Sequence, residues 1–217
     1  MKAFWALGAV HVASAVIPHP AARIVNRVTK PLLMPALGHP LGRRTAPAVR
    51  VALAASAVGD TALMAPGPVG ILGGVTGFGV AHLAYLTELT RLGRDAPRGL
   101  TGAIVAATTT VVAAGAAVLD RVLAGAGQRE LTVPVVGYAG LCAAMAASAV
   151  RAGLTLGGRR GRCLVAGGLL FVISDSMVAA ALFGPARWDA EGRLTAAIMI
   201  TYLAAQALLV EGLSADS

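Results

Sequence analysis

The feature that most limits the fold of this chain is a series of long apolar runs that contain almost no charge. Of its 217 residues, 57% are hydrophobic and 13% are charged, about half the charged fraction of an average soluble domain. Eight runs approach the roughly 20 apolar residues that a helix needs to cross a bilayer: 3–18, 29–41, 46–65, 69–90, 99–119, 131–150, 163–183 and 194–213. We therefore expect an all-α polytopic membrane protein, with about eight transmembrane helices in a single domain over residues 1–217.

The first two runs differ from the other six. Residues 1–20 have the outline of a secretory signal, with Lys2, an apolar core and the triplet Ala13-Ser14-Ala15. The apolar core continues past that triplet, so we favour a retained first span. The run 29–41 is short and contains three prolines, at positions 31, 35 and 40. Such a backbone is tolerated where neighbouring helices or water satisfy its polar groups, so we expect this run inside the bundle or at one interface.

The formal net charge of +8 comes from basic residues that lie in short clusters between the apolar runs. This pattern is typical of membrane-flanking loops and argues against a nucleic-acid partner; the expected partner is the lipid bilayer. With both termini in the cytoplasm, eleven basic residues lie on the cytoplasmic side: Lys2, Arg43, Arg44, Arg50, Arg91, Arg94, Arg98, Arg151, Arg159, Arg160 and Arg162. Seven lie opposite: Arg23, Arg27, Lys30, Arg121, Arg129, Arg187 and Arg193. The count favours this orientation, in the inner cell membrane.

Two acidic residues lie well inside the expected spans, whereas the other eight lie in loops or at span ends. These two are Asp60 and Asp175, and both are followed by a hydroxyl residue. A carboxyl group at membrane depth is costly and therefore indicates a function. Five further polar residues fall at matching depth, several of them three or four positions apart and so on one helix face: His82, Tyr85, Tyr138, Tyr202 and Gln206. Lys30 opens the second run and is expected at one rim. The sequence therefore predicts a polar pocket in the core of the bundle.

Structural roles remain open for several of these residues. Tyr138 and Tyr202 could belong to the aromatic belts at the membrane interfaces. His82 could be a core histidine bonded to a backbone carbonyl, and Lys30 could extend its ammonium group to the interface. The two aspartates could only join helices by hydrogen bonds.

A metal site is the less favoured alternative for the pocket. His82 with Asp60 and Asp175 would supply the three ligands that a hydrolytic zinc site usually needs, but we predict no metal and no cofactor. Cys142 and Cys163 have no metal-ligating neighbours in the sequence, so we interpret both as small apolar residues. His11, His19 and His39 have no periodic polar partners, and we interpret them as incidental.

Six motifs in order resemble the YhhN-type membrane family over nearly the whole chain. They are residues 29–35 (Thr-Lys-Pro-Leu-Leu-Met-Pro), Gly59-Asp60 followed by Leu63-Met64, residues 81–85 (Ala-His-Leu-Ala-Tyr), Tyr138, Phe171 with Ser174-Asp175, and Thr201-Tyr202 with Gln206. The family includes lysoplasmalogenases, which cleave the vinyl ether bond of lysoplasmalogens. The resemblance implies an eight-helix fold with Asp60 and Asp175 as the catalytic pair. It also implies substrate binding by Lys30, His82, Tyr85, Tyr138, Tyr202 and Gln206.

Paired carboxyl groups suit this hydrolysis of an alkenylglycerophosphocholine or -ethanolamine. Protonation of the outer alkene carbon gives an oxocarbenium ion, water adds to it, and the hemiacetal collapses to a fatty aldehyde and a glycerophospholipid headgroup. Burial favours the neutral form of a carboxylic acid, so one aspartic acid could donate the proton while the other stabilises the cation. The alternative is a proton-coupled transporter or carrier of a lipid-like solute, because buried acids also serve as proton relays.

Overall fold

The computed structural model describes residues 1–42, 45–189 and 191–214, and these form helices joined by short turns. In this part of the chain the elements are α1 (Lys2–Val16), α2 (Pro20–Thr29), η1 (Lys30–Leu32), α3 (Leu33–Gly38), α4 (Pro47–Ala62), α5 (Gly67–Leu92), α6 (Arg98–Gly125), η2 (Arg129–Leu131), α7 (Thr132–Leu156), α8 (Gly158–Phe183), η3 (Ala186–Asp189) and α9 (Arg193–Leu213), where η denotes a short 3-10 helix. The prediction of an all-α fold is confirmed.

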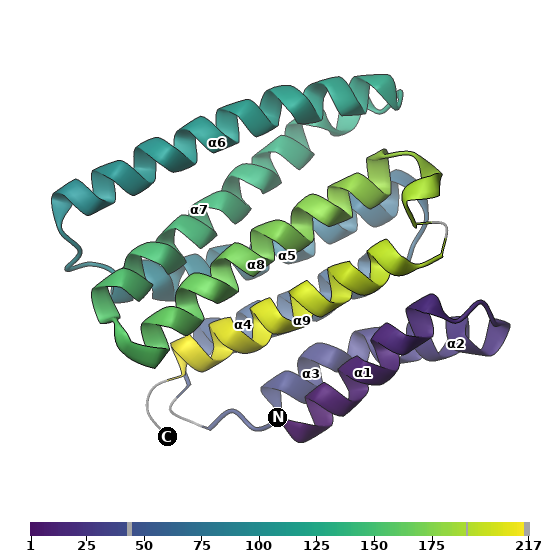
Figure 1. Ribbon diagram of the computed structural model, residues 1–217, viewed down its shortest axis with the longest axis horizontal. Helices are drawn as coiled ribbons and strands as arrows, with labels where there is room; N and C mark the ends of the chain where they lie inside the picture. Colours follow the sequence, from purple (N-terminus) through teal and green to yellow (C-terminus); the bar gives the residue numbers. More distant parts are fainter. Residues whose placement is uncertain (43–44, 190, 215–217) are drawn as a thin grey trace.

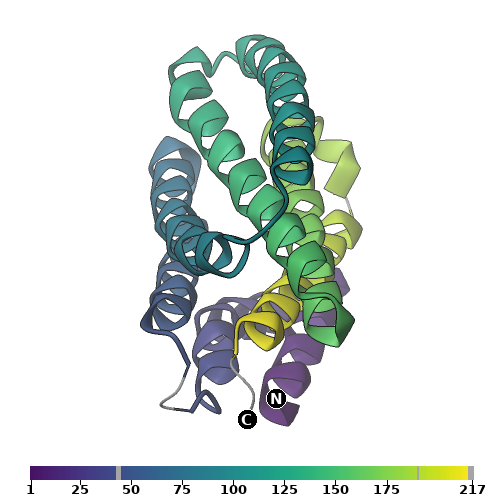
Figure 2. The same cartoon turned by 90° about the vertical axis from the view of Figure 1, so that its left-hand side faces the viewer.

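Seven of these elements pack in a closed ring. Going round the ring, each element contacts the next in the order α4, α5, α7, α8, α9, α1 and α3, and α3 contacts α4 again. Helix α6 lies outside the ring against α7, and α2 lies outside it against α1 (Figures 1 and 2). Side chains that point into the ring are therefore screened from lipid by helices on every side.

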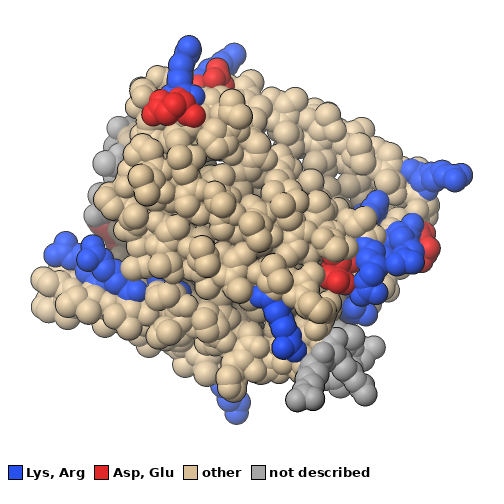
Figure 3. All heavy atoms as spheres, turned by 180° about the vertical axis from the view of Figure 1, so that it is seen from behind, with Lys and Arg blue, Asp and Glu red and all other residues tan. Residues whose placement is uncertain are grey.

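Five helical segments are long and apolar enough to cross a membrane: α5, α6, η2 with α7, α8 and α9. They contain 21 to 28 residues, and at about 1.5 Å per residue even the shortest matches the roughly 30 Å hydrocarbon layer. Helix α6 buries a single residue, Leu123, and exposes apolar side chains along the rest of its length. Figure 3 shows that Lys and Arg side chains lie mostly near the margins of one face, with a broad uncharged region between them. The chain is a polytopic membrane protein.

The second predicted segment differs from the expectation. Its helical structure starts at Pro20, nine residues before the predicted start at position 29, and continues through α2, η1 and α3 to Gly38. Pro31 has no N–H group to bond the carbonyl four residues before it, and the helix tightens there into η1. The sequence pattern missed α2 because its outward side carries Arg23 and Arg27, which interrupt the apolar run. Lys30 lies at this break, and its side chain points toward the interior of the bundle.

The basic residues used to orient the chain are only partly described. Arg43 and Arg44 lie outside the described residues, as does the side chain of Arg187. Helix α1 begins and α9 ends toward the same end of the bundle (Figure 1), which is consistent with an even number of crossings. The cytoplasmic location of that end stays a prediction.

Helices α4 and α5 are in close backbone contact next to Asp60. A Cβ atom added to Gly77 would lie 2.5 Å from the backbone nitrogen of Gly59, a distance that real Cβ atoms do not tolerate. Gly59 immediately precedes Asp60, so this contact between two glycines sets how far the carboxyl group of α4 stands from α5.

Gly77→Ala should therefore lower the thermal midpoint of the detergent-purified protein. Overpacking of a well-packed contact costs about 1–3 kcal/mol, which exceeds the roughly 1 kcal/mol that alanine contributes to helix stability. Gly79→Ala is the matched control, because its Cβ would meet only Leu141 at 3.9 Å. Equal midpoints for the two variants would contradict a backbone contact at Gly77.

Candidate functional site

A cavity of about 1090 Å³ extends from the interior of the ring outward to α6. Its lining comes from the halves of the helices next to the α4–α5, α6–α7 and α8–α9 connections. The polar lining is grouped in one region that includes Lys30, Asp60, Tyr138, Asp175 and Tyr202. The remainder is mostly aliphatic, with valines and small residues of α6 on one side and α7 and α8 on the other. The cavity therefore suits a ligand with a polar end and a long apolar part.

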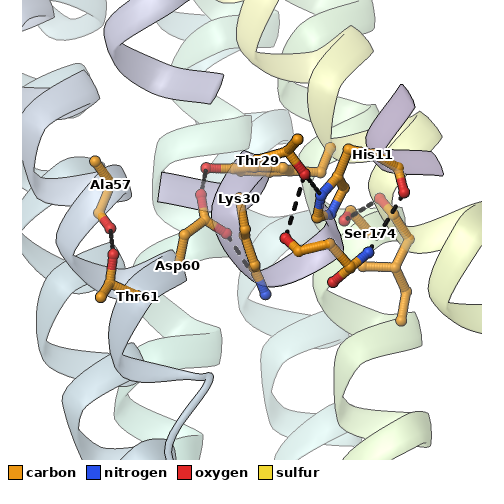
Figure 4. Close-up of polar contacts among 10 residues, drawn as sticks. His11, Thr29, Lys30, Ala57, Asp60, Thr61 and Ser174 are labelled. Carbon is orange, nitrogen blue, oxygen red and sulfur yellow. Dashed lines mark hydrogen bonds and ion pairs between the residues drawn. The ribbon is translucent and has the colours of Figure 1, made fainter. Parts of the chain in front are cut away.

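Asp60 is the more enclosed of the two acids, with 3% of its side chain exposed. Its Oδ2 accepts a hydrogen bond of 2.8 Å from the Tyr202 hydroxyl, which reaches across the ring from α9. Its Oδ1 lies 3.9 Å from Nζ of Lys30, and Figure 4 shows these two side chains pointing toward each other. Both partners of Asp60 are donors, as an ionised carboxylate requires.

Asp175 belongs to a second cluster, formed by α5, α7 and α8. Its Oδ2 accepts a 2.5 Å hydrogen bond from the Tyr138 hydroxyl. Nε2 of His82 lies 3.1 Å from that hydroxyl and 3.5 Å from Asp175 Oδ2. Because Tyr138 gives its single proton to Asp175, His82 donates from Nε2 to Tyr138, and its buried Nδ1 has no partner. Asp175 keeps 19% of its side chain exposed and its carboxyl group lines the cavity.

Aromatic rings connect the two acid clusters. Phe171 is fully buried and packs edge-on against both His82 and Tyr202, with ring centroids 4.7 and 5.7 Å apart. Phe78 also packs edge-on against Tyr202, with ring centroids 5.8 Å apart. These contacts restrict the rotation of the tyrosine and histidine rings, so the hydrogen-bonding groups of both clusters are held in position.

A third polar group lies one helical turn from the Asp60 cluster. The Tyr85 hydroxyl donates to Gln206 Oε1 at 2.6 Å, and Gln206 Nε2 donates to Ser56 Oγ at 2.9 Å. Ser56 lies four residues before Asp60 on α4, and Gln206 lies four residues after Tyr202 on α9. The two antiparallel helices are thus bridged on consecutive turns, and this second bridge is fully buried.

A model of the YhhN family matches residues 25–213. The chain belongs to the YhhN family. A search of curated proteins and a search of solved structures returned no match.

The structure divides the predicted site residues of this YhhN protein into two groups. Asp60, Asp175, Lys30, Tyr138 and Tyr202 line the cavity. His82, Tyr85 and Gln206 have no exposed surface and stand behind the lining residues, to which they are linked by hydrogen bonds or by neighbouring helical turns. Their position supports the orientation of other side chains; direct contact with a substrate stays a prediction for them.

His11 has more structure around it than the sequence suggested. It is buried, and its Nδ1 lies 2.8 Å from the Thr29 hydroxyl (Figure 4). Asn26 adds bonds to Ser14 and to the His11 carbonyl, so that α1 and α2 are joined by a polar network. Thr29 directly precedes Lys30, and the interpretation of His11 as incidental is therefore wrong. The eighteen-residue separation of His11 and Thr29 gave no periodic signal that could have revealed the contact.

Cys142 also has neighbours that the sequence did not indicate. The Cys142 sulfur, a His82 nitrogen and an Asp175 oxygen all lie within 4.8 Å of one another. The prediction that Cys142 has no metal-ligating residues near it is therefore wrong, because the fold brings His82 and Asp175 to it from other helices. Its position on α7, one turn after Tyr138, is the only sequence signal that could have placed it beside Asp175.

Tyr85→Phe tests whether the buried bridge of Tyr85, Gln206 and Ser56 stabilises the bundle. The substitution leaves the buried oxygen of Gln206 without its donor, which should cost about 1–3 kcal/mol and lower the thermal midpoint in detergent. Thr87→Val is the control, because the Thr87 hydroxyl is exposed and bonds only a carbonyl of its own helix. A Tyr85→Phe midpoint equal to that of wild type would show that the bridge does not stabilise the bundle.

Proposed function

We propose that this protein is a membrane-embedded hydrolase that cleaves the vinyl ether bond of lysoplasmalogens by acid/base catalysis with Asp60 and Asp175. The observation that supports it is the presence of both carboxyl groups on the wall of one cavity whose remaining surface is apolar. Membership of the YhhN family is consistent with this chemistry.

The shape of the cavity fits an amphipathic substrate with one chain. Its volume is at the upper limit of the roughly 300–1,000 Å³ typical of small-molecule pockets, so a long chain can be enclosed. The aliphatic wall along α6 is the natural place for the alkenyl chain, since α6 lies at the outside of the ring and borders lipid. The headgroup then lies toward Lys30, whose ammonium group can bind a phosphate.

Asp175 is the group that we assign as the acid. Its Oδ2 is occupied by the Tyr138 hydroxyl, whereas Oδ1 has no protein partner among the described residues and is free to hold a transferable proton. His82 and Tyr138 fix the carboxyl plane and so aim this oxygen. Proton transfer to the outer alkene carbon leaves Asp175 ionised and places the positive charge on the ether-bearing carbon and its oxygen.

We assign two tasks to Asp60: it stabilises the oxocarbenium ion, and it accepts a proton from the water that adds to this ion. Its two donor partners, Tyr202 and Lys30, stabilise a carboxylate, which in turn stabilises the oxocarbenium ion. When water adds to that ion, Asp60 accepts the released proton. The hemiacetal then loses its hydroxyl proton to the departing glycerol oxygen, giving the aldehyde and the headgroup alcohol. By exchange with water, Asp60 then loses the proton that it accepted and Asp175 regains the proton that it donated.

Asp175→Asn and Asp60→Asn should each reduce aldehyde release from a lysoplasmalogen by about 10²-fold or more, the range of a lost general acid or base. The measurement is aldehyde formation by purified protein in detergent or nanodiscs. Asp95→Asn is the matched control, because Asp95 is exposed at the turn after α5. Size-exclusion profiles and helix content should be unchanged in all three variants.

Wild-type turnover in both site variants would contradict the acid/base assignment. If wild-type protein forms no aldehyde but shows substrate-dependent proton flux in proteoliposomes, the carrier alternative replaces the proposed hydrolase. A lysophospholipid with an acyl chain is the substrate control, since its ester cannot give an aldehyde by this route.

Lys30→Gln should raise the KM for a lysoplasmalogen about tenfold, the effect expected for loss of one charged hydrogen bond to phosphate. Alkenylglycerol, which lacks the phosphate, is the matched substrate and should show no such rise. An equal change for both substrates would mean that Lys30 acts only through its contact with Asp60.

A further inference from the structure

Three ligand groups of different chemistry meet beside the cavity, and the proposed reaction gives a role to only two of them. They come from three helices: His82 from α5, Cys142 from α7 and Asp175 from α8. One ligand atom of each lies within 4.8 Å of the other two. Cys142 has no role in the proposed hydrolysis, and this leaves its position between an imidazole and a carboxylate to be explained.

We propose that His82, Cys142 and Asp175 form a binding site for a thiophilic divalent cation of the zinc class, and that the bound ion inhibits the protein. An imidazole, a thiolate and a carboxylate are the ligand types that zinc prefers. The metal site stands on geometry alone. Its inhibitory effect rests on the proposed function, because it requires Asp175 to be the acid.

The distances need little adjustment to hold an ion. Ligand atoms bound to tetrahedral zinc lie roughly 3.3–3.6 Å apart, given bonds of about 2.0–2.3 Å. His82 Nε2 and Asp175 Oδ2 already lie 3.5 Å apart. The sulfur of Cys142 lies within 4.8 Å of the other two ligand atoms, and a side-chain rotation can bring it to bonding distance of the ion. The fourth position faces the cavity, which Cys142 and Asp175 both line, and there water completes the coordination.

Charge balance favours the ion in this apolar setting. On binding, the Cys142 thiol and the Asp175 carboxyl group each release a proton to water in the cavity. A thiolate, an ionised Asp175 and a neutral His82 then carry two negative charges against the two positive charges of the ion. The complex is neutral, so it avoids the cost of leaving net charge inside the bundle.

Two features make the ion an effector from solution and not a tightly held cofactor. His82 donates from Nε2 to Tyr138 in the hydrogen-bonded cluster, and this bond must break before Nε2 can bind metal. The proton then resides on Nδ1, which is buried and has no partner. Histidines in tight sites have such a partner, and its absence lowers affinity by about 10–100-fold.

Occupancy removes the proposed acid from the reaction. With Oδ2 bound to the ion, Asp175 stays ionised, so its Oδ1 cannot carry the proton for the alkene carbon. Zinc should therefore inhibit aldehyde release, and a chelator should restore it.

Binding is measured without substrate. Cd²⁺ or Co²⁺ is added to purified protein in detergent, and the thiolate-to-metal charge-transfer absorption is recorded. We expect the band in wild type and in Cys163→Ala, and its loss in Cys142→Ala. The two variants are matched, because the chain has only two cysteines and Cys163 lies outside the ligand cluster. Absence of the band in wild type, or its persistence in Cys142→Ala, overturns the proposal.

A second measurement needs no change at Cys142. In the Cys163→Ala protein, Zn²⁺ should slow alkylation of Cys142 by a maleimide, and an alkylation rate unaffected by Zn²⁺ counts against the site. For inhibition, each variant is compared with its own metal-free rate. The zinc concentration for half inhibition should rise at least about tenfold in Cys142→Ala and stay unchanged in Cys163→Ala.

The outcomes separate the two proposals. A charge-transfer band in protein that forms no aldehyde supports the metal site and removes the proposed function. Aldehyde formation without any band supports the hydrolase and removes the metal site. A band with full activity at saturating zinc refutes the inhibitory effect and the role of Asp175 as the acid.

Discussion

Two carboxyl groups inside a bundle of apolar helices are stable here because each accepts a hydrogen bond from a tyrosine on another helix. An unpaired carboxylate at this depth costs several kcal/mol, and much of the interior is arranged around that cost. Tyr202 reaches Asp60 across the ring, and Tyr138 reaches Asp175 from the neighbouring helix. The helices that supply these four groups, α4, α7, α8 and α9, all belong to the ring, so their relative positions are set by packing on both sides.

The environments of the two acids differ in a way that suits different tasks. Asp60 is enclosed and has a cation and a hydroxyl as partners, whereas Asp175 has neutral partners and is open to the cavity. Paired carboxyl groups with such unequal surroundings are how hydrolases assign acid and base roles to the same residue type. The same exposure that lets Asp175 meet a substrate also lets it meet an ion, together with Cys142. The proposed proton transfer by Asp175 and the proposed binding of a cation to it would therefore exclude each other.

The buried polar residues that do not line the cavity join helices to one another close to the two acids. Tyr85, Gln206 and Ser56 bond only to one another within the described residues, and they join α4, α5 and α9 one turn away from Asp60. Their effect on the site is to link α4 to α9 across the ring, whereas the contact of Gly59 with Gly77 packs α4 directly against α5. The network of His11 and Thr29 plays a comparable part for the broken helix that bears Lys30.

The apolar runs alone determined that the chain crosses a membrane as helices, because only a helix satisfies its own backbone in lipid. The cost of burying charge distinguished Asp60 and Asp175 from the other acidic residues without any coordinates, and the structure places both on the wall of one cavity. Spacing of three and four residues correctly put His82 with Tyr85, and Tyr202 with Gln206, on shared helix faces.

Only the tertiary structure decided which face of one helix packs against which face of another. Contacts such as His11 with Thr29, Tyr202 with Asp60, and Cys142 with His82 join residues on different helices. Helical periodicity fixes directions within one helix and says nothing about the rotation of another helix beside it.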